Sequence, residues 1–330
     1  MKKLINRPGD VVTETMIGLG LAHPDLLRVD AHERIIVRVD APTAGKVGLV
    51  SGGGSGHEPL HGGFVGRGML DAACPGDVFV PPTPEQIVAA TRAVDGGAGV
   101  LYIVKNYVAD VTSFDTAAAL AAAEGIRVRS VLVDDDMATP ERVRASGRRG
   151  AGGTLAVEKI ASALAATGAD LHAVAAMAAK VNDQVRSMGV ALTSCTVPAA
   201  GKPAFTLGDA EVQLGVGIHG ELGHSRPFAP ADDITRLLAG PVIEDLGLER
   251  GDSVLAIVNG MGGTPLTELY IVFRALAQLL DDQDITIGRS LVGNYVTALD
   301  MSGCSITLLR LDEELTSLWD APVHTPALRW

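Results

Sequence analysis

The first half of the chain alternates short β-rich runs with helical patterns. Runs typical of buried strands occur at 46–50, 78–80, 100–104 and 128–133. Between them lie helical patterns, one capped by Thr83 with Pro84 at its first position, and one rich in alanine at 113–124. This alternation is typical of a mostly parallel sheet covered by helices on both faces.

The second half follows a different pattern. Residues 155–188 predict a long helical region, broken near Gly168, and a further helix is expected near 265–280. Extended segments are expected at 191–197, 211–220, 253–260, 285–293 and 304–311. We therefore expect an α/β protein with two packed α/β domains, each a mostly parallel or mixed sheet covered by helices. The expected domains are 1–185, carrying a Gly-rich substrate loop, and 186–330.

Composition and charge exclude several classes of protein. The formal net charge is −12, and no basic stripe interleaved with aromatic residues appears, so nucleic-acid binding is not expected. No run of 18 uncharged apolar residues occurs, and the N-terminus lacks a signal-peptide pattern, so we expect a cytoplasmic protein without a membrane span. Cys74, Cys195 and Cys304 are too few and too widely spaced for a disulfide framework or a thiolate metal site.

The segment SGGGSGHEPLHGG at 51–63 carries the strongest signal. A Gly-rich turn directly after a strand exposes successive backbone N–H groups, which can cradle a phosphate or a hydroxylated small molecule. The segment does not match the dinucleotide fingerprint, because His57 stands where glycine is required, and the chain has no phosphate-loop motif. A purely structural turn is the alternative.

Residues His57 to His61 also satisfy the zinc-peptidase pattern HExxH. That pattern binds zinc only on a helix, where the two histidines share one face. Pro59 inside the motif and Gly62-Gly63 after it oppose a helix. We therefore do not expect a zinc site, although a zinc peptidase remains an alternative.

Two further segments carry reactive side chains. In GVGIHGELGHSR, His219 is expected at a strand end, where an unprotonated imidazole can act as a nucleophile toward a carbonyl carbon. The alternatives are a solvated loop histidine, or a metal site with Glu221 and His224, whose spacing fits no standard array. In IVKNYVAD, Lys105 and Asp110 follow a buried strand, and Asp110 is either a general base or a helix N-cap.

The run Asp134-Asp135-Asp136 follows the strand expected at 128–133. Its carboxylates could bind Mg²⁺, but a solvated loop is the more usual role for such a run at a strand end. We therefore assign no metal ligand to this chain.

Together these segments resemble one family, the K subunit of dihydroxyacetone kinase. The resemblance covers essentially the whole chain and is carried by long ungapped strings: NRPGDVV (6–12), GGGSGHEP, VKNY, TSCTVPAAGKP (193–203), GIHGE, LLRLDEEL and DAPVHTPAL. It implies that His219 forms a covalent hemiaminal with the ketone carbon of the substrate. It also implies that His57 and Asp110 bind the hydroxyls and act as acid and base. Gly54, Ser55, Gly56 and Lys105 would complete the substrate site.

The resemblance also implies partners. The chain would bind no cofactor itself, because a separate L subunit would hold ADP or ATP with Mg²⁺ and transfer the phosphoryl group. That subunit would be recharged by a phosphoenolpyruvate-driven phosphocarrier, the M subunit. A homodimer is expected. Substrate would be dihydroxyacetone or a related small ketose.

The sequence departs from the family pattern at two places. Pro81 stands where relatives commonly have serine, and Leu222-Gly223-His224 follows GIHGE in place of Pro-Gly. Both changes leave the chemistry of His219 intact but put the identity of the ketose in doubt. The alternatives are a kinase for a four-carbon ketose such as erythrulose, and a non-catalytic paralogue that binds a ketose and regulates transcription through a partner.

Overall fold

The computed structural model describes residues 2–138 and 147–330. They divide into two compact units that are each built from several stretches of chain. The first unit comprises Met1–Val133, Ala156–Val181 and Ser317–Trp330, and the second comprises Asp134–Leu155 and Asn182–Thr316. The expected boundary near 185 lies just inside the second unit, while 134–155 and 317–330 fall outside a simple division into two halves.

The first unit contains a mixed sheet, which in the described residues has six strands in the order β1-β2-β4-β3-β5-β6. The strands are β1 (Leu27–Asp30), β2 (Ile35–Arg38), β3 (Gly48–Ser55), β4 (Ala72–Val78), β5 (Val100–Lys105) and β6 (Val128–Val133). The four strands β4, β3, β5 and β6 are parallel, and β2 runs antiparallel to both β1 and β4. Their carboxyl ends therefore meet along one edge, where ligands of open α/β sheets usually bind.

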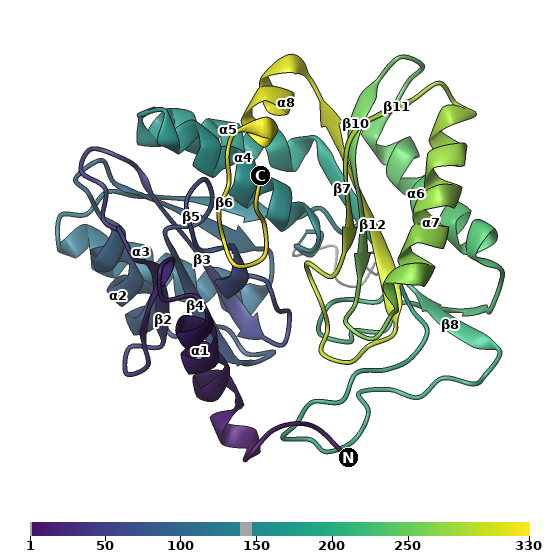
Figure 1. The fold of residues 1–330 in the computed structure, drawn as a ribbon, viewed down its shortest axis with the longest axis horizontal. Coiled ribbons are helices and arrows are strands. Elements are labelled where there is room, and N and C mark those ends of the chain that lie inside the picture. The colour runs from purple at the N-terminus through teal and green to yellow at the C-terminus, as the bar shows by residue number, and fades with distance from the viewer. Residues whose placement is uncertain (1, 139–146) are drawn as a thin grey trace. The chain divides into compact units, whose positions relative to one another are not determined.

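Helices of the first unit cover this sheet (Figure 1). They are α1 (Val11–Ala22), α2 (Pro84–Val94), α3 (Val108–Ala123) and most of α4 (Gly153–Ala166) and α5 (Leu171–Asp183), with short 3-10 turns at Pro8–Asp10 and Gly62–Phe64. Thr83 is the N-cap of α2, as predicted, and it also forms a reciprocal capping box with Gln86, which was not predicted. α2 and α3 bury apolar side chains against the sheet, including Ile87 and Phe114.

The last residues of the described chain belong to this first unit. The backbone of Arg67 and that of His324 exchange hydrogen bonds of 3.1 and 2.8 Å. Ala327 N donates to Gly63 O at 2.9 Å, so the C-terminal segment packs beside the loop that follows β3. Gly68 is required at the same contact, because a Cβ there would lie 2.1 Å from Pro322 O.

The second unit also contains a mixed sheet, whose six strands in the described residues follow the order β11-β10-β12-β7-β8-β9. They are β7 (Val185–Ala191), β8 (Glu211–Leu214), β9 (His224–Pro227), β10 (Ser253–Gly260), β11 (Thr286–Gly293) and β12 (Gly303–Leu311). β10 and β11 are parallel, whereas every other pairing is antiparallel. The expected fold class, two α/β units with mixed or mostly parallel sheets, is confirmed.

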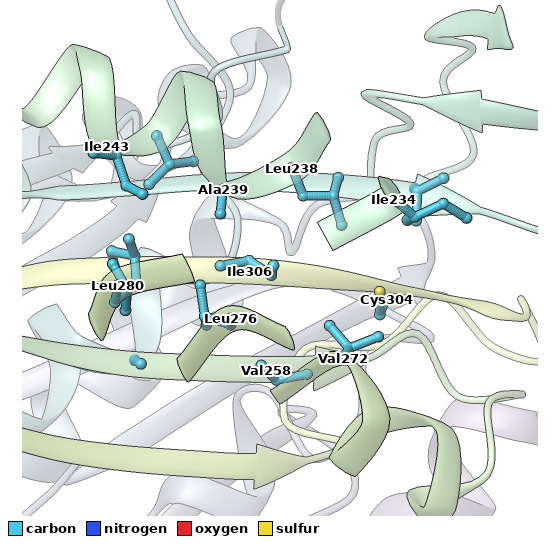
Figure 2. Packing of buried hydrophobic residues seen from close by; sticks show 14 of the residues in the cluster. Ile234, Leu238, Ala239, Ile243, Val258, Val272, Leu276, Leu280, Cys304 and Ile306 are labelled. Atoms are coloured by element: carbon cyan, nitrogen blue, oxygen red, sulfur yellow. The ribbon is translucent and has the colours of Figure 1, made fainter. Parts of the chain in front are cut away.

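The core of the second unit lies between its sheet and two helices, α6 (Ala231–Leu246) and α7 (Leu266–Asp281). Figure 2 shows Leu238 and Ile243 of α6 and Leu276 of α7 in one buried cluster with Val258 of β10 and Ile306 of β12. Burial of these side chains is the main favourable term for this layer, at about 2 kcal/mol for each large aliphatic group. The last helix, α8 (Glu313–Asp320), follows β12.

Several predicted boundaries are wrong, among them the extended segment expected at 191–197, of which only Ala191 belongs to β7. The strand expected at 78–80 is β4 and ends at Val78. The helical region expected to reach 188 is indeed broken near Gly168, but it ends at Asp183, and β7 begins at Val185. The extended segment expected at 211–220 ends at Leu214, so His219 lies in a turn and not at a strand end.

Within the described part of the chain, no helix combines the length and the apolar character needed to cross a membrane.

Candidate active site

The glycine-rich segment is part of a strand and not the turn that its composition suggests. β3 continues through Gly52-Gly53-Gly54 to Ser55, and this stretch pairs in parallel with β4. Glycine is a poor strand former, so its presence here must serve close packing. A Cβ on Gly52 would lie 2.7 Å from Cys74 O, and one on Gly54 would lie 2.6 Å from Val80 N.

Gly53 has a different neighbour, the side chain of Lys105. A Cβ on Gly53 would lie 2.3 Å from Lys105 Nζ and 3.5 Å from Asp110 Oδ1. Only a residue without a side chain leaves room for the amine and the carboxylate at this point. The strand therefore brings together two of the residues expected in the site, although Gly53 itself was not among them.

β3 ends at Ser55, and the polar groups of Ser55 and Gly56 are hydrogen-bonded within the protein. The hydroxyl of Ser55 donates to Gly76 O at 2.7 Å, and Phe79 N donates to Ser55 O at 3.0 Å. The backbone N–H of Gly56, whose φ is +102°, donates to both carboxylate oxygens of Glu58 at 3.1 Å. Glu58 is thus a backbone partner of this loop, which the HExxH pattern did not suggest.

Lys105 and Asp110 are positioned by neighbouring elements. Lys105 is the last residue of β5, and its side chain is completely buried. Asp110 is the third residue of α3 and is buried; the N-cap position belongs to Tyr107, so the N-cap alternative for Asp110 is wrong. Burial lowers the pKa of Lys105, and the negative charges of Asp110 and Glu158 oppose that shift.

His57 is buried beside the loop that carries the Pro81 departure. Its ring stacks on that of Phe79, with centroids 5.1 Å apart and planes inclined by 17°. Phe79 is followed by Val80 and Pro81, and this loop packs on Gly76, where a Cβ would lie 2.0 Å from Val80 O. A change at Pro81 therefore falls close to a residue expected to bind substrate.

The HExxH match lies in bends and turns and not on a helix, as Pro59 predicts. Its second histidine has another role. His61 Nδ1 lies 2.6 Å from Glu158 Oε1, and His61 Nε2 lies 2.7 Å from Lys105 Nζ. Neither His61 nor Glu158 was expected in the site. The available signal was a single carboxylate in the mostly apolar run TLAVEKIASALAA of α4, whose one other charged residue is Lys159.

A cavity of about 500 Å³ lies within the first unit. It is bounded mainly by apolar side chains of α1, by the strand residues Gly53 to Ser55 and by His61. Of the residues expected to bind substrate, Gly54 and Ser55 line it, whereas Lys105, Asp110 and His57 do not.

In the second unit, His219 is held by Glu221. His219 N donates to Glu221 Oε2 at 3.0 Å, and His219 Nδ1 lies 3.2 Å from Glu221 Oε1. Burial would raise the pKa of Glu221, but the hydrogen bond and charge of His219, together with Arg149, lower it to about 2. An ionised carboxylate can only accept, so Nδ1 carries a proton, and in the neutral form of the ring Nε2 then carries the lone pair.

Glu221 is in turn placed by Arg149 and a glycine. A Cβ on Gly217 would lie 2.1 Å from Glu221 Oε2 and 2.5 Å from Arg149 Nη1, so glycine makes room for both groups. Arg149 also donates to Asp136 Oδ2 at 2.8 Å and to Gly215 O at 3.0 Å. Burial raises the pKa of Asp136 to about 6, against the charge of Arg149.

The acidic run at 134–136 is neither a solvated loop nor a cluster open to Mg²⁺. Asp135 is completely buried and accepts from Ala151 N at 2.7 Å and Gly153 N at 2.6 Å, at the start of α4, and from Ser187 Oγ. Asp134 pairs with Asn182 at 2.7 Å. Each carboxylate of the run therefore has a structural partner in the second unit.

Among residues 2–138 and 147–330, no group of three or more His, Cys, Asp or Glu side chains is arranged to hold a metal ion. His219, Glu221 and His224 accordingly form no metal cluster in that part of the chain.

Comparison with known proteins adds sequence relatives over the full chain. The profile of the Dak1 domain family matches residues 17–327. The dihydroxyacetone-binding subunit of a PEP-dependent dihydroxyacetone kinase from Escherichia coli is 47% identical, covering 100% of this chain and 99% of its own. The corresponding subunit of PTS-dependent dihydroxyacetone kinase 1 from Listeria innocua is 46% identical over 99% and 100%. An L-erythrulose kinase from Pectobacterium atrosepticum is 38% identical, but the match spans 56% of its length.

Solved structures agree with these relatives. A dihydroxyacetone kinase operon co-activator superposes with a TM-score of 0.88 at 33% identity, covering 96% of this chain and 97% of that one. The dihydroxyacetone kinase of C. freundii superposes with a TM-score of 0.90 at 35% identity, covering 99% of this chain and 60% of that one.

Proposed function

The chain belongs to the Dak1 domain family, and from this membership we propose that it is the ketose-binding subunit of a dihydroxyacetone kinase. It would bind dihydroxyacetone and present a hydroxyl for phosphoryl transfer, giving dihydroxyacetone phosphate. The expected family is confirmed by the relatives over the full length of the chain. The observation that carries the proposal is the pairing of His219 with an ionised Glu221, because this pairing fixes a nucleophilic tautomer.

The proposed binding step is covalent. The lone pair of His219 Nε2 attacks the carbonyl carbon of the ketose, a C–N bond forms, the C=O π bond breaks, and the oxygen takes a proton from water to become a hydroxyl. The ring then returns its Nδ1 proton to water, while the carboxylate of Glu221, 3.2 Å from that nitrogen, stabilises the transient positive charge on the ring. No proton is gained or lost overall, and the adduct is a neutral hemiaminal. A polyol such as glycerol has no carbonyl carbon and cannot form this bond.

The proposed transfer step uses the buried groups of the first unit. Asp110 takes the proton from the attacking hydroxyl as general base, and His57 binds a hydroxyl and acts as acid or base. Lys105 and the strand residues Gly54, Ser55 and Gly56 complete the substrate contacts. In support, Lys105 and Asp110 approach the same point beside Gly53.

The phosphoryl donor is proposed to be a separate L subunit that holds ADP or ATP with Mg²⁺, recharged by a phosphocarrier M subunit. In support, the relatives from Escherichia coli and Listeria innocua are named as the dihydroxyacetone-binding subunits of PEP- and PTS-dependent kinases. A cytoplasmic homodimer that binds no cofactor of its own completes the proposal.

Two other functions have some support. The L-erythrulose kinase relative favours a four-carbon ketose as substrate, and the Pro81 loop beside His57 is where the selection could be made. The co-activator structure favours a regulatory, non-catalytic role. The chain retains both His57 and Asp110, buried in the first unit, which argues for catalysis.

The test is native mass spectrometry with dihydroxyacetone, erythrulose and glycerol. We expect the mass of wild-type protein to rise by the full mass of one ketose, without loss of water, and to stay unchanged with glycerol. His219→Ala should abolish the adduct, whereas His224→Ala, an exposed histidine on β9, should keep it. The absence of any adduct in wild-type protein would overturn the proposed binding step.

A second assay separates a kinase from a regulator. With a charged L subunit present, wild-type protein should turn over ketose, while Asp110→Asn should retain the adduct and lose about 100-fold or more in transfer rate, the usual contribution of a general base. Adduct formation without turnover in wild-type protein would favour the regulatory role. Equal transfer by wild type and Asp110→Asn would refute Asp110 as the base.

A further inference from the structure

Three buried polar side chains from separate elements of the first unit form one hydrogen-bonded chain. Lys105 ends β5, His61 lies in the loop after β3, and Glu158 lies in α4. Glu158 Oε1 is 2.6 Å from His61 Nδ1, and His61 Nε2 is 2.7 Å from Lys105 Nζ. Lys105 and Glu158 have no exposed surface, and His61 is 6% exposed.

Burying three polar side chains in this way lowers the stability of the fold. An ammonium and a carboxylate removed from water lose several kcal/mol of hydration each, and apolar residues of similar volume would often be more stable. The hydrogen-bonded chain also ends beside Asp110, the proposed base. Lys105 Nζ donates to Gly52 O at 3.2 Å and lies beside the position of a Cβ on Gly53, as does Asp110 Oδ1.

We propose that Glu158 and His61 are positioning residues for the kinase reaction, which keep Lys105 a fixed and protonated donor beside the base Asp110. This inference rests on the proposed function and deepens it, because it assigns two further residues to the transfer step. The ammonium of Lys105 has three N–H groups. His61 Nε2 and Gly52 O accept two of them, which fixes the amine beside Gly53, at the point that Asp110 Oδ1 also approaches.

The proton positions follow from this arrangement. When Lys105 is an ammonium, it donates to His61 Nε2, so His61 is neutral, and its Nδ1–H donates to the Glu158 carboxylate. If one proton passes from Lys105 to His61 Nε2 and another from His61 Nδ1 to Glu158, then Lys105 becomes an amine and Glu158 an acid. No proton enters or leaves the group, so Glu158 controls the charge of Lys105 across the neutral ring.

The charges around the chain agree with a neutral His61. Burial and the positive charge of Lys105, followed by His57, hold the pKa of His61 well below its ordinary value. Burial raises the pKa of Glu158, whereas the positive charge of Lys105 and the hydrogen bond with His61 Nδ1 favour its carboxylate. The groups that face Lys105 are Asp110 from α3, Glu158 from α4, and His61 from the loop after β3. Removing the charge of Glu158 leaves Asp110 as the main group that favours the ammonium.

The test compares Glu158→Gln with a matched control. Glutamine keeps the size and hydrogen-bonding capacity of the side chain and removes its charge. Ser162→Ala lies one turn further along α4, at another buried polar group, whose Oγ has no hydrogen-bond partner in the described part of the chain. The assay is steady-state phosphoryl transfer from a charged L subunit between pH 6 and 9, with adduct formation followed by native mass spectrometry.

We expect Glu158→Gln to keep the His219 adduct and to lower kcat about tenfold, with little change in KM. The basic limb of its kcat profile should move to lower pH by about one unit, because the ammonium of Lys105 loses a favourable charge. Ser162→Ala should match wild type in both. A lower kcat with an unshifted limb, or a variant that matches wild type, would overturn the proposal.

A second measurement does not depend on activity or on a stable variant. Long-range ¹H–¹⁵N spectra of wild-type protein labelled at histidine should show His61 neutral, with its proton on Nδ1, down to about pH 5, well below the ordinary histidine pKa. Assignment uses the signal lost in His61→Gln. A doubly protonated His61 near pH 6.5 would refute the proposed arrangement of protons on Lys105, His61 and Glu158. Absence of both adduct and transfer in wild type, with a neutral His61, would refute the proposed function alone.

Discussion

A single methyl group added at Gly53 tests how tightly the Lys105 amine is held. Gly53 does not have a positive φ, so alanine is compatible with its backbone. The new Cβ would lie 2.3 Å from Lys105 Nζ, and an ordinary contact of 3.4 Å requires the amine to retreat by about 1.1 Å. Lys105 is completely buried and bound to His61 Nε2 at 2.7 Å and Gly52 O at 3.2 Å, so this retreat breaks at least one of these bonds.

The magnitude follows from the bond that is lost. A hydrogen bond to a charged group contributes about 2 kcal/mol, and the first unit should lose that amount of stability. For a unit of this size the loss lowers Tm by roughly 4–8 °C. Transfer activity should also fall while the His219 adduct is retained. The assay is thermal unfolding followed by circular dichroism, together with phosphoryl transfer.

The matched control is Gly18→Ala, at a glycine inside α1 whose Cβ would meet nothing within 4 Å. This change should leave Tm unchanged or raise it, because alanine is the better helix former by about 1 kcal/mol. If Gly53→Ala is as stable and as active as Gly18→Ala, the amine is free to move and the reasoning about the buried chain is refuted.

Two further predictions concern the second unit. Asp135→Ala should lower the free energy of unfolding, measured in urea, by about 3 kcal/mol, because it leaves Ala151 N, Gly153 N and Ser187 Oγ without their shared buried acceptor. The control Asp183→Ala, at an exposed residue, should leave that free energy almost unchanged. Equal urea midpoints for the two variants would contradict the buried role of Asp135. Glu221→Gln should slow ketose adduct formation, followed by time-resolved mass spectrometry, because it no longer fixes the Nδ1–H tautomer of His219, and the exposed Glu244→Gln serves as control. Adduct formation by Glu221→Gln at the wild-type rate would show that Glu221 does not act on His219. The pKa of Glu221 is lowered from 4.5 to about 2, so its carboxylate stabilises the fold above pH 4.5, and that contribution should disappear as pH falls toward 2.

The sequence predicts best where local signals decide the structure. The N-cap at Thr83 was predicted correctly, and the strands β10, β11 and β12 were predicted close to their observed bounds, because a cap or an apolar run acts over a few residues. The reactive residues His57, Lys105, Asp110 and His219 were singled out by motif, and their roles stay predictions. What the sequence could suggest was their chemistry and not their neighbours.

The sequence fails where a residue is explained by something distant along the chain. The glycines of β3 were predicted to form a turn, but they are required by the close approach of Cys74, Lys105 and Val80, which are distant in the sequence. Glu158 lies 97 residues from its partner His61, so neither spacing nor periodicity connects them. The acidic run at 134–136 was predicted to be solvated, because its partners, Arg149 and backbone groups at the start of α4, come later in the sequence.

The division of the first unit between distant stretches of chain has a consequence for biosynthesis. The loop that carries His57 and His61 is translated early, but Ala327, which binds Gly63 O, and His324, which pairs with Arg67, leave the ribosome only after the whole second unit. Until then the nascent first unit lacks its last packing layer beside that loop. The packing around this loop is therefore completed only after the second unit has been translated, and a chain shortened before residue 320 would lack these contacts even though every proposed catalytic residue had been made.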